Sequence, residues 1–192
     1  VRVGLIGYGY AGATFHAPLI SAVPGLSLDA FVSSNPAPIS ERYPQATVHA
    51  QADALLRDPA IDLVVIAAPN PTHFPLAAAA MRAGKHVVVD KPFTLDLAEA
   101  RALIALSQET GRNLTVFHNR RWDSDFATVR KALGEGLVGD PVHLETRFDR
   151  FRPQVRNRWR ENAGPGAGVW FDLGPHLADH ALLLMGLPDR AV

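Results

Sequence analysis

The sequence contains no cysteine among its 192 residues, which excludes disulfide bonds, a thiolate nucleophile and cysteine-ligated metal sites. Lack of cysteine is typical of a reducing compartment, so we expect a cytoplasmic protein. The sequence also lacks any excess of charge: Lys plus Arg and Asp plus Glu both number 19, so no overall field attracts nucleic acid or an anionic membrane. Long apolar runs are absent too. The run at residues 63–69 is far too short to span a bilayer, and we expect neither a membrane span nor a signal peptide.

Short apolar runs alternate with helical patterns through the first two thirds of the chain. This alternation predicts strands at residues 1–6, 26–32, around Val48, 63–67, 86–89 and 114–117. It predicts helices at residues 11–22 (kinked by Pro18), 52–57, 74–83 and, opened by a capping box of Asp96 and Glu99, up to Thr110. Strands that are apolar throughout are typical of a parallel sheet buried on both faces. We therefore predict an α/β fold, a Rossmann doubly wound parallel sheet.

The pattern changes after His118. A helix is predicted at residues 123–133, an antiparallel half-exposed strand at 141–150, and a helix at 171–185. We expect a dinucleotide-binding Rossmann domain over residues 1–118 and a partial C-terminal substrate or dimerisation domain over residues 119–192. One exposed strand does not make a sheet, so the second domain is predicted to be part of an α+β open-sheet domain, truncated at its C-terminal end.

A glycine motif lies between the first predicted strand and the first predicted helix. Gly7, Gly9 and Gly12 have the G-x-G-x-x-G spacing of a dinucleotide-binding turn. In such a turn the first glycine permits the tight bend, the second lets the backbone approach a pyrophosphate, and the third lets helix and strand pack closely. The helix that follows, beginning near Tyr10 and Ala11, offers N–H groups to the phosphates. A glycine-rich turn without a ligand is the alternative, and the strand–turn–helix context argues against it.

The choice between NAD and NADP is expected at the end of the second strand. No carboxylate stands there to bind the two ribose hydroxyls of NAD. Ser33 and Ser34 can instead donate to a 2′-phosphate, with Arg42 as a possible counter-charge. The alternative is that both serines merely begin a loop. We expect NADP as the cofactor, with NAD also possible.

Three residues are candidates for catalysis. Lys91 follows the fifth strand, whose carboxyl end faces the ligand crevice, and can stabilise charge on a substrate oxygen. His176, with an ordinary pKa of about 6.5, can accept a hydroxyl proton, and Asp172 lies four residues before it on one helical face. The alternatives are a surface lysine, a packed core histidine, and Asp172 as a helix N-cap.

Two rival functions remain open at this stage. Asp172, His176 and His180 could hold a divalent metal in a hydrolase or lyase, although we expect no metal. Basic and aromatic residues also interleave late in the chain, a pattern that can bind single-stranded nucleic acid; they are Arg147, Phe148, Arg150, Phe151, Arg152, Arg156, Arg158, Trp159 and Arg160. Asp149 and Glu161 interrupt that run, and we expect no nucleic-acid partner.

The chain resembles the Gfo/Idh/MocA oxidoreductase family over essentially its whole length. The resemblance is carried by residues 7–12, 69–73, 83–86 and 90–92 and by Asp172 with His176. It is closer still to the branch that holds NADP-dependent scyllo-inositol dehydrogenase, through residues 32–34, 117–123 and 156–161. The family usually has Glu at the position of Asp90.

The resemblance implies a dehydrogenase that moves a hydride between NADP and a secondary hydroxyl of a cyclitol or sugar. It implies Lys91, Asp172 and His176 as the catalytic set and adds cofactor contacts from Asn70, His73, Asp90 and Asn119. The full expected cofactor site comprises Gly7, Gly9, Tyr10, Ala11, Gly12, Ser33, Ser34, Ala68, Asn70, His73, Asp90, Lys91, Asn119 and Trp159. We expect a small polyol or sugar substrate and a homo-oligomer at full length; an NADP-binding sensor without catalysis is the alternative.

Overall fold

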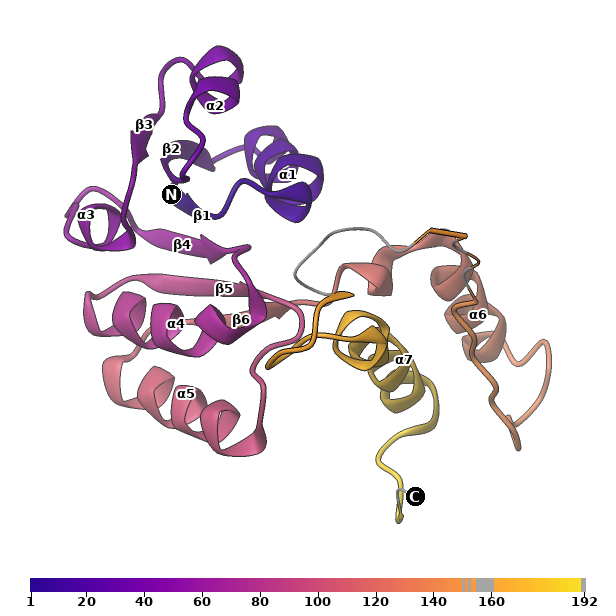
Figure 1. The fold of residues 1–192 in the computed structure, drawn as a ribbon. Coiled ribbons are helices and arrows are strands. Elements are labelled where there is room, and N and C mark those ends of the chain that lie inside the picture. The colour runs from indigo at the N-terminus through magenta and orange to yellow at the C-terminus, as the bar shows by residue number, and fades with distance from the viewer. Residues whose placement is uncertain (150, 152, 155–160, 191–192) are drawn as a thin grey trace. The chain divides into compact units, whose positions relative to one another are not determined.

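The computed structural model describes residues 1–149, 151, 153–154 and 161–190. These residues fall into two compact units, Val1–Phe117 and His118–Val192, and each is described by itself. The first unit carries one sheet with helices on both faces, and the second carries helices α6 and α7 (Figure 1).

The first unit is built on a parallel sheet of six strands in the order β3-β2-β1-β4-β5-β6. Its strands are β1 (Arg2–Ile6), β2 (Ser27–Val32), β3 (Thr47–His49), β4 (Leu63–Ile66), β5 (His86–Asp90) and β6 (Leu114–Phe117). The chain moves outward from β1 in one direction through β2 and β3, then returns to β4 on the other side of β1. This is the doubly wound Rossmann arrangement, which confirms the predicted fold. Its ligand crevice lies beyond the carboxyl ends of the strands where the order reverses.

Helices follow the strands as expected, with two short additions. They are η1 (Gly12–His16), α1 (Ala17–Ala22), α2 (Ala37–Arg42), α3 (Ala52–Leu56), η2 (Asn70–Thr72), α4 (His73–Arg82) and α5 (Leu97–Thr110). The short elements α2 and η2 were not predicted. Pro36 directly before α2 and Pro38 within it are typical of a turn, and only Ile39 of α2 is buried. Half of the predicted capping box of α5 is present, because the Glu99 N–H donates to Asp96 Oδ1 at 2.8 Å. The Glu99 carboxylate accepts the Leu95 N–H at 3.1 Å instead of that of the N-cap residue.

The predicted kink near Pro18 takes the form of a π-helical turn. Residues Gly12–His16 form this turn, and α1 begins directly after it with Pro18 in its first positions. Proline has no N–H to donate to the preceding turn, so the hydrogen-bond ladder is interrupted there. Compared with a regular α-helix, the turn therefore changes the direction in which the side chains just before Pro18 point.

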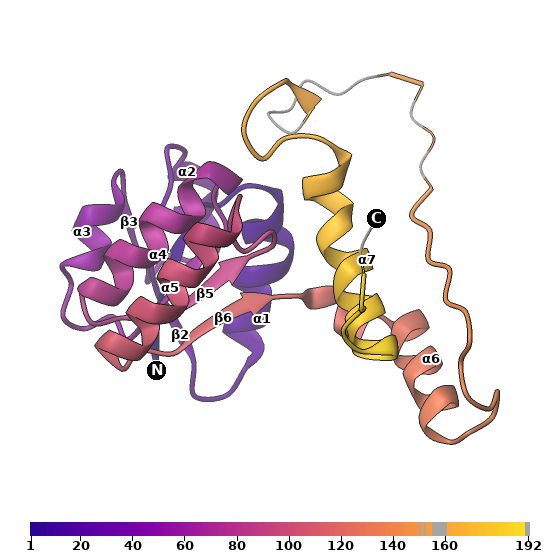
Figure 2. The ribbon, with the colours of Figure 1, turned by 90° about the horizontal axis from the view of Figure 1, so that it is seen from below.

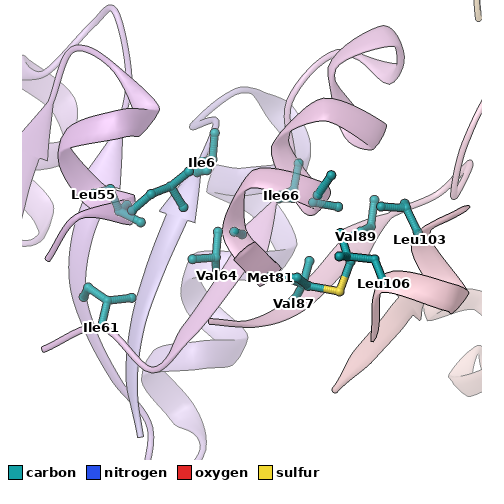
Figure 3. Close-up of a cluster of buried hydrophobic side chains, with 14 of the residues drawn as sticks. Ile6, Leu55, Ile61, Val64, Ile66, Met81, Val87, Val89, Leu103 and Leu106 are labelled. Atoms are coloured by element: carbon teal, nitrogen blue, oxygen red, sulfur yellow. The ribbon is translucent and has the colours of Figure 1, made fainter. Parts of the chain in front are cut away.

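Two apolar clusters hold the sheet between its helices. On one face, side chains from β4 and β5, such as Val64, Ile66, Val87 and Val89, pack with α3, α4 and α5 (Figure 3). On the other face, Leu5, Phe31 and Val65 pack with α1 and α2. Alternate residues of β4 and β5 enter opposite clusters, because successive side chains of a strand point to opposite faces. Figures 1 and 2 both show α4 and α5 side by side on their face of the sheet.

The second unit contains η3 (Asn119–Trp122), α6 (Ser124–Gly134) and α7 (Val169–Met185). The prediction of a strand at residues 141–150 is wrong for its described part, because residues 141–149 adopt no regular structure. A strand is stabilised by hydrogen bonds to a neighbouring strand, and the described residues of this unit supply no partner. Across the described residues, no helix combines the length and the apolar character needed to cross a membrane.

Candidate active site

The predicted site residues of the first unit gather at the carboxyl edge of its sheet. They lie in the loops that follow β1, β2, β4 and β5, four strands whose parallel register brings these ends to one edge. Residues far apart in sequence therefore meet along one line, beside the point where the strand order reverses. Open α/β sheets bind their ligands at this place.

The glycine turn is shaped by two different requirements. Gly7 has φ +96°, and a Cβ there would lie 2.5 Å from the Ala67 carbonyl oxygen. A Cβ on Gly12 would collide with the Gly7 carbonyl oxygen, so both glycines are needed by the backbone itself. Gly9 differs, because a Cβ there would meet nothing within 4 Å. The open space at Gly9 fits the close approach of a pyrophosphate.

The loop after β2 holds the two serines. The Asn35 N–H donates to Ser33 Oγ at 3.1 Å, so the Ser33 hydroxyl stabilises the loop itself. Ser34 is exposed. Arg42, at the end of α2, lies over the Tyr43 ring with its guanidinium carbon 5.9 Å from the ring centre. The loop thus offers one exposed hydroxyl, and residues 33–36 include no carboxylate.

The loop after β4 is fastened by His73. Its imidazole is buried, with Nδ1 2.7 Å from the Pro92 carbonyl oxygen and Nε2 3.0 Å from the Ala68 carbonyl oxygen. A carbonyl oxygen only accepts, so the ring links the loop after β4 to the loop after β5 by donating from Nδ1–H to Pro92. Asn70, the first residue of η2, is also buried. His73 therefore holds two loops of the site together.

The loop after β5 carries Asp90 and Lys91. The Lys91 N–H donates to Asp90 Oδ1 at 2.8 Å, and Asp90 Oδ2 lies 3.6 Å from His16 Nε2. Burial alone would raise the pKa of the Asp90 carboxyl. The neighbouring His16 and the Lys91 N–H outweigh burial and hold this pKa below its ordinary value. Asp90 is therefore a buried carboxylate, and Lys91 beside it is half-buried.

In the second unit, α7 carries the other two catalytic candidates. The helix begins after Gly168, so Asp172 lies in its first turn and is not the N-cap, which removes that alternative. Pro175 lies inside the helix, in its second turn. Asp172 is half-buried and His176 is buried, four residues further along the helix. The rings of His176 and Phe148 are nearly perpendicular, with their centres 6.3 Å apart.

Next to these candidates lies a charged cluster that sequence reasoning missed. Arg121 donates twice to Asp179, from Nε at 2.8 Å and from a terminal nitrogen at 2.5 Å, and His118 Nδ1 lies 3.9 Å from the same carboxylate. Burial acts to raise the pKa of Asp179, but Arg121 and His118 outweigh it and lower that pKa. The cluster joins η3, which contains Asn119, to α7. The sequence signal for this cluster was the spacing of three residues between His176 and Asp179, which places both on one face of a helix.

The metal-site alternative gains no support. His180 stacks on Phe126 with ring centres 4.0 Å apart, and its Nε2 lies 3.3 Å from the Arg120 carbonyl oxygen. No group of three His, Asp or Glu side chains suited to a metal occurs among the described residues. The i, i+4, i+8 spacing of Asp172, His176 and His180 thus does not make a metal site in the described structure.

The basic and aromatic run is only partly described. Arg147 pairs with Glu145, and Phe148 packs under Arg120, whose guanidinium carbon lies 5.0 Å from its ring centre. Phe151 is exposed. The predicted cofactor contact Trp159 lies outside the described residues, as do Arg150, Arg152, Arg156, Arg158 and Arg160.

The fold and the glycine turn define a dinucleotide-binding oxidoreductase domain, and comparison with known proteins gives the family. Residues 1–118 match the "Oxidoreductase family, NAD-binding Rossmann fold", and residues 126–192 match the "GFO/IDH/MocA C-terminal domain". The chain belongs to the Gfo/Idh/MocA family of oxidoreductases.

Two curated relatives align with 98% of the chain. The uncharacterized oxidoreductase YdgJ of Escherichia coli is 58% identical, and 54% of its length is covered. The scyllo-inositol 2-dehydrogenase (NADP(+)) IolW of Bacillus subtilis is 37% identical, and 52% of its length is covered. The chain thus spans about half the length of the curated relatives it matches.

Solved structures agree with the fold. A protein from Klebsiella pneumoniae is 54% identical with a TM-score of 0.88, covering 98% of this chain and 52% of that one. The yvaA protein of Bacillus subtilis is 37% identical with a TM-score of 0.93, covering 97% of this chain and 53% of that one.

Proposed function

We propose that the protein is a dehydrogenase that uses a nicotinamide dinucleotide, preferably NADP, to oxidise a secondary hydroxyl of a cyclitol or sugar and to reduce the matching ketone. The observation that carries the proposal is the glycine turn. Its backbone requires Gly7 and Gly12, whereas Gly9 is not needed for packing and faces open space. Packing within the fold does not explain a glycine at position 9, but the close approach of a phosphate group to its backbone does.

The preference for NADP rests on the loop after β2. A carboxylate at the end of that strand would repel a 2′-phosphate, and residues 33–36 contain none. Ser34 is exposed and able to donate to a phosphate, whereas the Ser33 hydroxyl already accepts from the Asn35 N–H. The relative IolW is named as an NADP(+) enzyme, which supports the same choice.

The proposed chemical roles fall to the cofactor and to three side chains. When bound, the nicotinamide supplies the group that accepts or returns the hydride. Lys91 donates a hydrogen bond to the reacting oxygen and stabilises the charge that develops on it. His176 accepts the hydroxyl proton during oxidation and returns it during reduction. Asp172 binds a substrate hydroxyl or orients the imidazole, one turn away on α7.

Further positions complete the proposed cofactor site. The N–H groups of the first helical turn, at Tyr10, Ala11 and Gly12, bind the phosphates. Ala68 and Asn70 after β4, Asp90 after β5, and Asn119 in η3 contribute cofactor contacts. His73 acts mainly by holding the loops after β4 and β5 together, because both of its ring nitrogens face backbone carbonyls.

The substrate class is taken from named relatives. IolW is a scyllo-inositol 2-dehydrogenase, and Inositol 2-dehydrogenase 1 of Saccharopolyspora erythraea is 34% identical over 147 residues. Both names describe oxidation of a ring hydroxyl of a cyclitol. We therefore select scyllo-inositol as the first substrate to test.

The test follows nicotinamide absorbance with scyllo-inositol, with NADP and NAD side by side. It uses this chain and an extended chain, in which this sequence continues into the C-terminal half of YdgJ. Reduction of NADP in preference to NAD supports the proposal. Tight NADP binding without turnover in either protein would reject scyllo-inositol as the substrate. It would favour the alternative of a cofactor-binding sensor. Binding of neither dinucleotide contradicts the proposed function.

A further inference from the structure

His16 is a buried histidine to which the proposed chemistry gives no role. Its side chain is 4% exposed, and it lies in the turn that follows the glycine motif. Nε2 makes no hydrogen bond to any described residue, yet it lies 3.6 Å from Asp90 Oδ2. A buried polar atom without a hydrogen bond is costly, so a histidine at this place calls for a functional explanation.

The local helix geometry is what directs His16 inward. It is the last residue of the π-helical turn Gly12–His16, and π turns insert one extra residue into a helix. That insertion rotates the residues before α1 relative to a regular α-helix. Gly12 and His16, the two buried residues of the turn, are its first and last. Turns of this kind are frequent at functional sites.

The surroundings of His16 join three parts of the site. The ring belongs to the helix that starts at the glycine turn after β1. It faces the carboxylate of Asp90 at the end of β5, and it packs against Phe117 at the end of β6, with ring centres 4.3 Å apart. Asp90 in turn accepts the Lys91 N–H at 2.8 Å. A chain of contacts therefore runs from the phosphate-binding turn, through His16 and Asp90, to the backbone of Lys91.

We propose that His16 is a positioning residue: by holding the Asp90 carboxylate, it fixes the backbone at Lys91 relative to the glycine turn. This inference rests on the proposed function, in which the glycine turn holds the cofactor phosphates and Lys91 acts on the substrate. The distance of 3.6 Å is longer than a hydrogen bond, so the ring nitrogen faces the carboxylate and bonds to it only on a closer approach. Contacts of this kind often shorten when the ligand binds.

The test distinguishes the contribution of the His16 ring nitrogen from the contribution of the packing of the ring. His16→Phe keeps a ring against Phe117 but removes the nitrogen that faces Asp90, whereas His16→Gln keeps an N–H group. His86→Phe is the matched control, because it makes the same change at the opposite end of β5, where His86 Nδ1 accepts the Asn113 N–H at 3.0 Å. Two readouts are measured on this chain: hydrogen exchange at the Lys91 amide without cofactor, and the affinity for NADPH.

We expect His16→Phe to speed exchange at the Lys91 amide and to weaken NADPH binding by about tenfold, whereas His16→Gln stays within about threefold of the wild type. In an Asp90→Asn background, His16→Phe should add nothing to either change, because the contact is already lost. If His16→Phe does not fold, His16→Leu also removes the nitrogen that faces Asp90 and must itself speed exchange at the Lys91 amide.

Unchanged Lys91 exchange in His16→Phe, or equal changes in His86→Phe, would overturn the inference. Full additivity with Asp90→Asn would do the same, since the ring would then act only by packing on Phe117. A wild-type chain that binds no NADPH contradicts the proposed function instead. In that case, exchange at Lys91 in the unliganded chain still decides whether His16 positions this loop.

Discussion

The two ends of β5 each carry a lysine, and the two lysines have different surroundings. Lys85, before the strand, is buried, and its ammonium donates to the carbonyl oxygens of Asp58 at 2.6 Å and Ile61 at 2.7 Å. Lys91, after the strand, is half-buried beside a carboxylate in the loop that faces the ligand crevice. The same residue type is therefore a structural fastening at one edge of the sheet and a catalytic candidate at the other.

Other polar groups at the amino and carboxyl edges of the sheet differ in the same way as the two lysines. At the amino edge, Asp62 accepts the Arg2 N–H at 2.8 Å, and Asp29 accepts from Arg2 and Ser27. These polar groups are satisfied by neighbours within the same edge, which serves stability. The carboxyl edge instead holds an open space at Gly9 and the buried pair of His16 and Asp90. This difference supports the proposal that ligand chemistry belongs to the carboxyl edge.

The largest expected effect concerns Lys91. Lys91→Met keeps the length of the side chain but removes the donor to the reacting oxygen, so turnover by the extended chain should fall about 10²- to 10³-fold. NADPH affinity should change much less. Lys85→Met is the matched control, and its turnover per folded molecule should stay near that of the wild type. Equal losses of turnover in both variants would contradict the division between the two edges.

The second effect concerns stability, for which Lys85 is expected to matter more than Lys91. Lys85→Met removes two charge-assisted hydrogen bonds and leaves two carbonyl groups without that donor, so the free energy of unfolding should fall by about 2 kcal/mol. Urea unfolding of this chain measures the change, with Lys91→Met for comparison. A larger loss of stability in Lys91→Met than in Lys85→Met would contradict the structural role given to Lys85.

The third effect is on cofactor choice. Ser34→Asp places a carboxylate where a 2′-phosphate is proposed to bind, so the ratio of NADP to NAD affinity should fall by about tenfold. Gln45→Asp makes the same charge change in an exposed turn before β3, at the amino edge, and should leave the ratio unaltered. Calorimetric titration with both cofactors gives the ratio. Equal ratios in the two variants would reject the assignment of Ser34.

The smallest effect is on pH dependence. The pKa of Asp90 is lower in the folded protein than its ordinary value of 3.8, so the charged carboxylate stabilises the fold above that value. This stabilisation is lost as the pH falls below about 4 and through the lower folded pKa. Asp90→Asn should therefore flatten the decline of the unfolding free energy in acid. An acid decline as steep as that of the wild type would show that Asp90 does not contribute.

Much of the first unit follows from its sequence, because both the strands and the glycine turn have local signals. Buried parallel strands appear as continuous apolar runs, and Gly7, Gly9 and Gly12 have a spacing fixed by the turn itself. The short helix α2 escaped prediction, since a single buried residue and two prolines give no helical pattern. Strands and turns could be predicted where neighbouring residues alone determine them.

The parts that escaped depend on contacts between distant residues. His16 and Asp90 meet only after the sheet has formed, and Arg121 and Asp179 are 58 positions apart. The strand predicted at residues 141–150 had the correct alternation, but alternation does not supply a partner strand. The start of α7 was predicted two residues late, at Phe171 instead of Val169.

The most direct test of the central claim, that the carboxyl edge holds a dinucleotide, is the NADPH affinity of Gly9→Val measured together with its unfolding free energy. The side chain would enter space that is open in the fold, so stability should stay close to that of the wild type. It would also occupy the place proposed for the pyrophosphate, so affinity should fall by at least about tenfold. A stable variant that binds NADPH as tightly as the wild type would contradict the account.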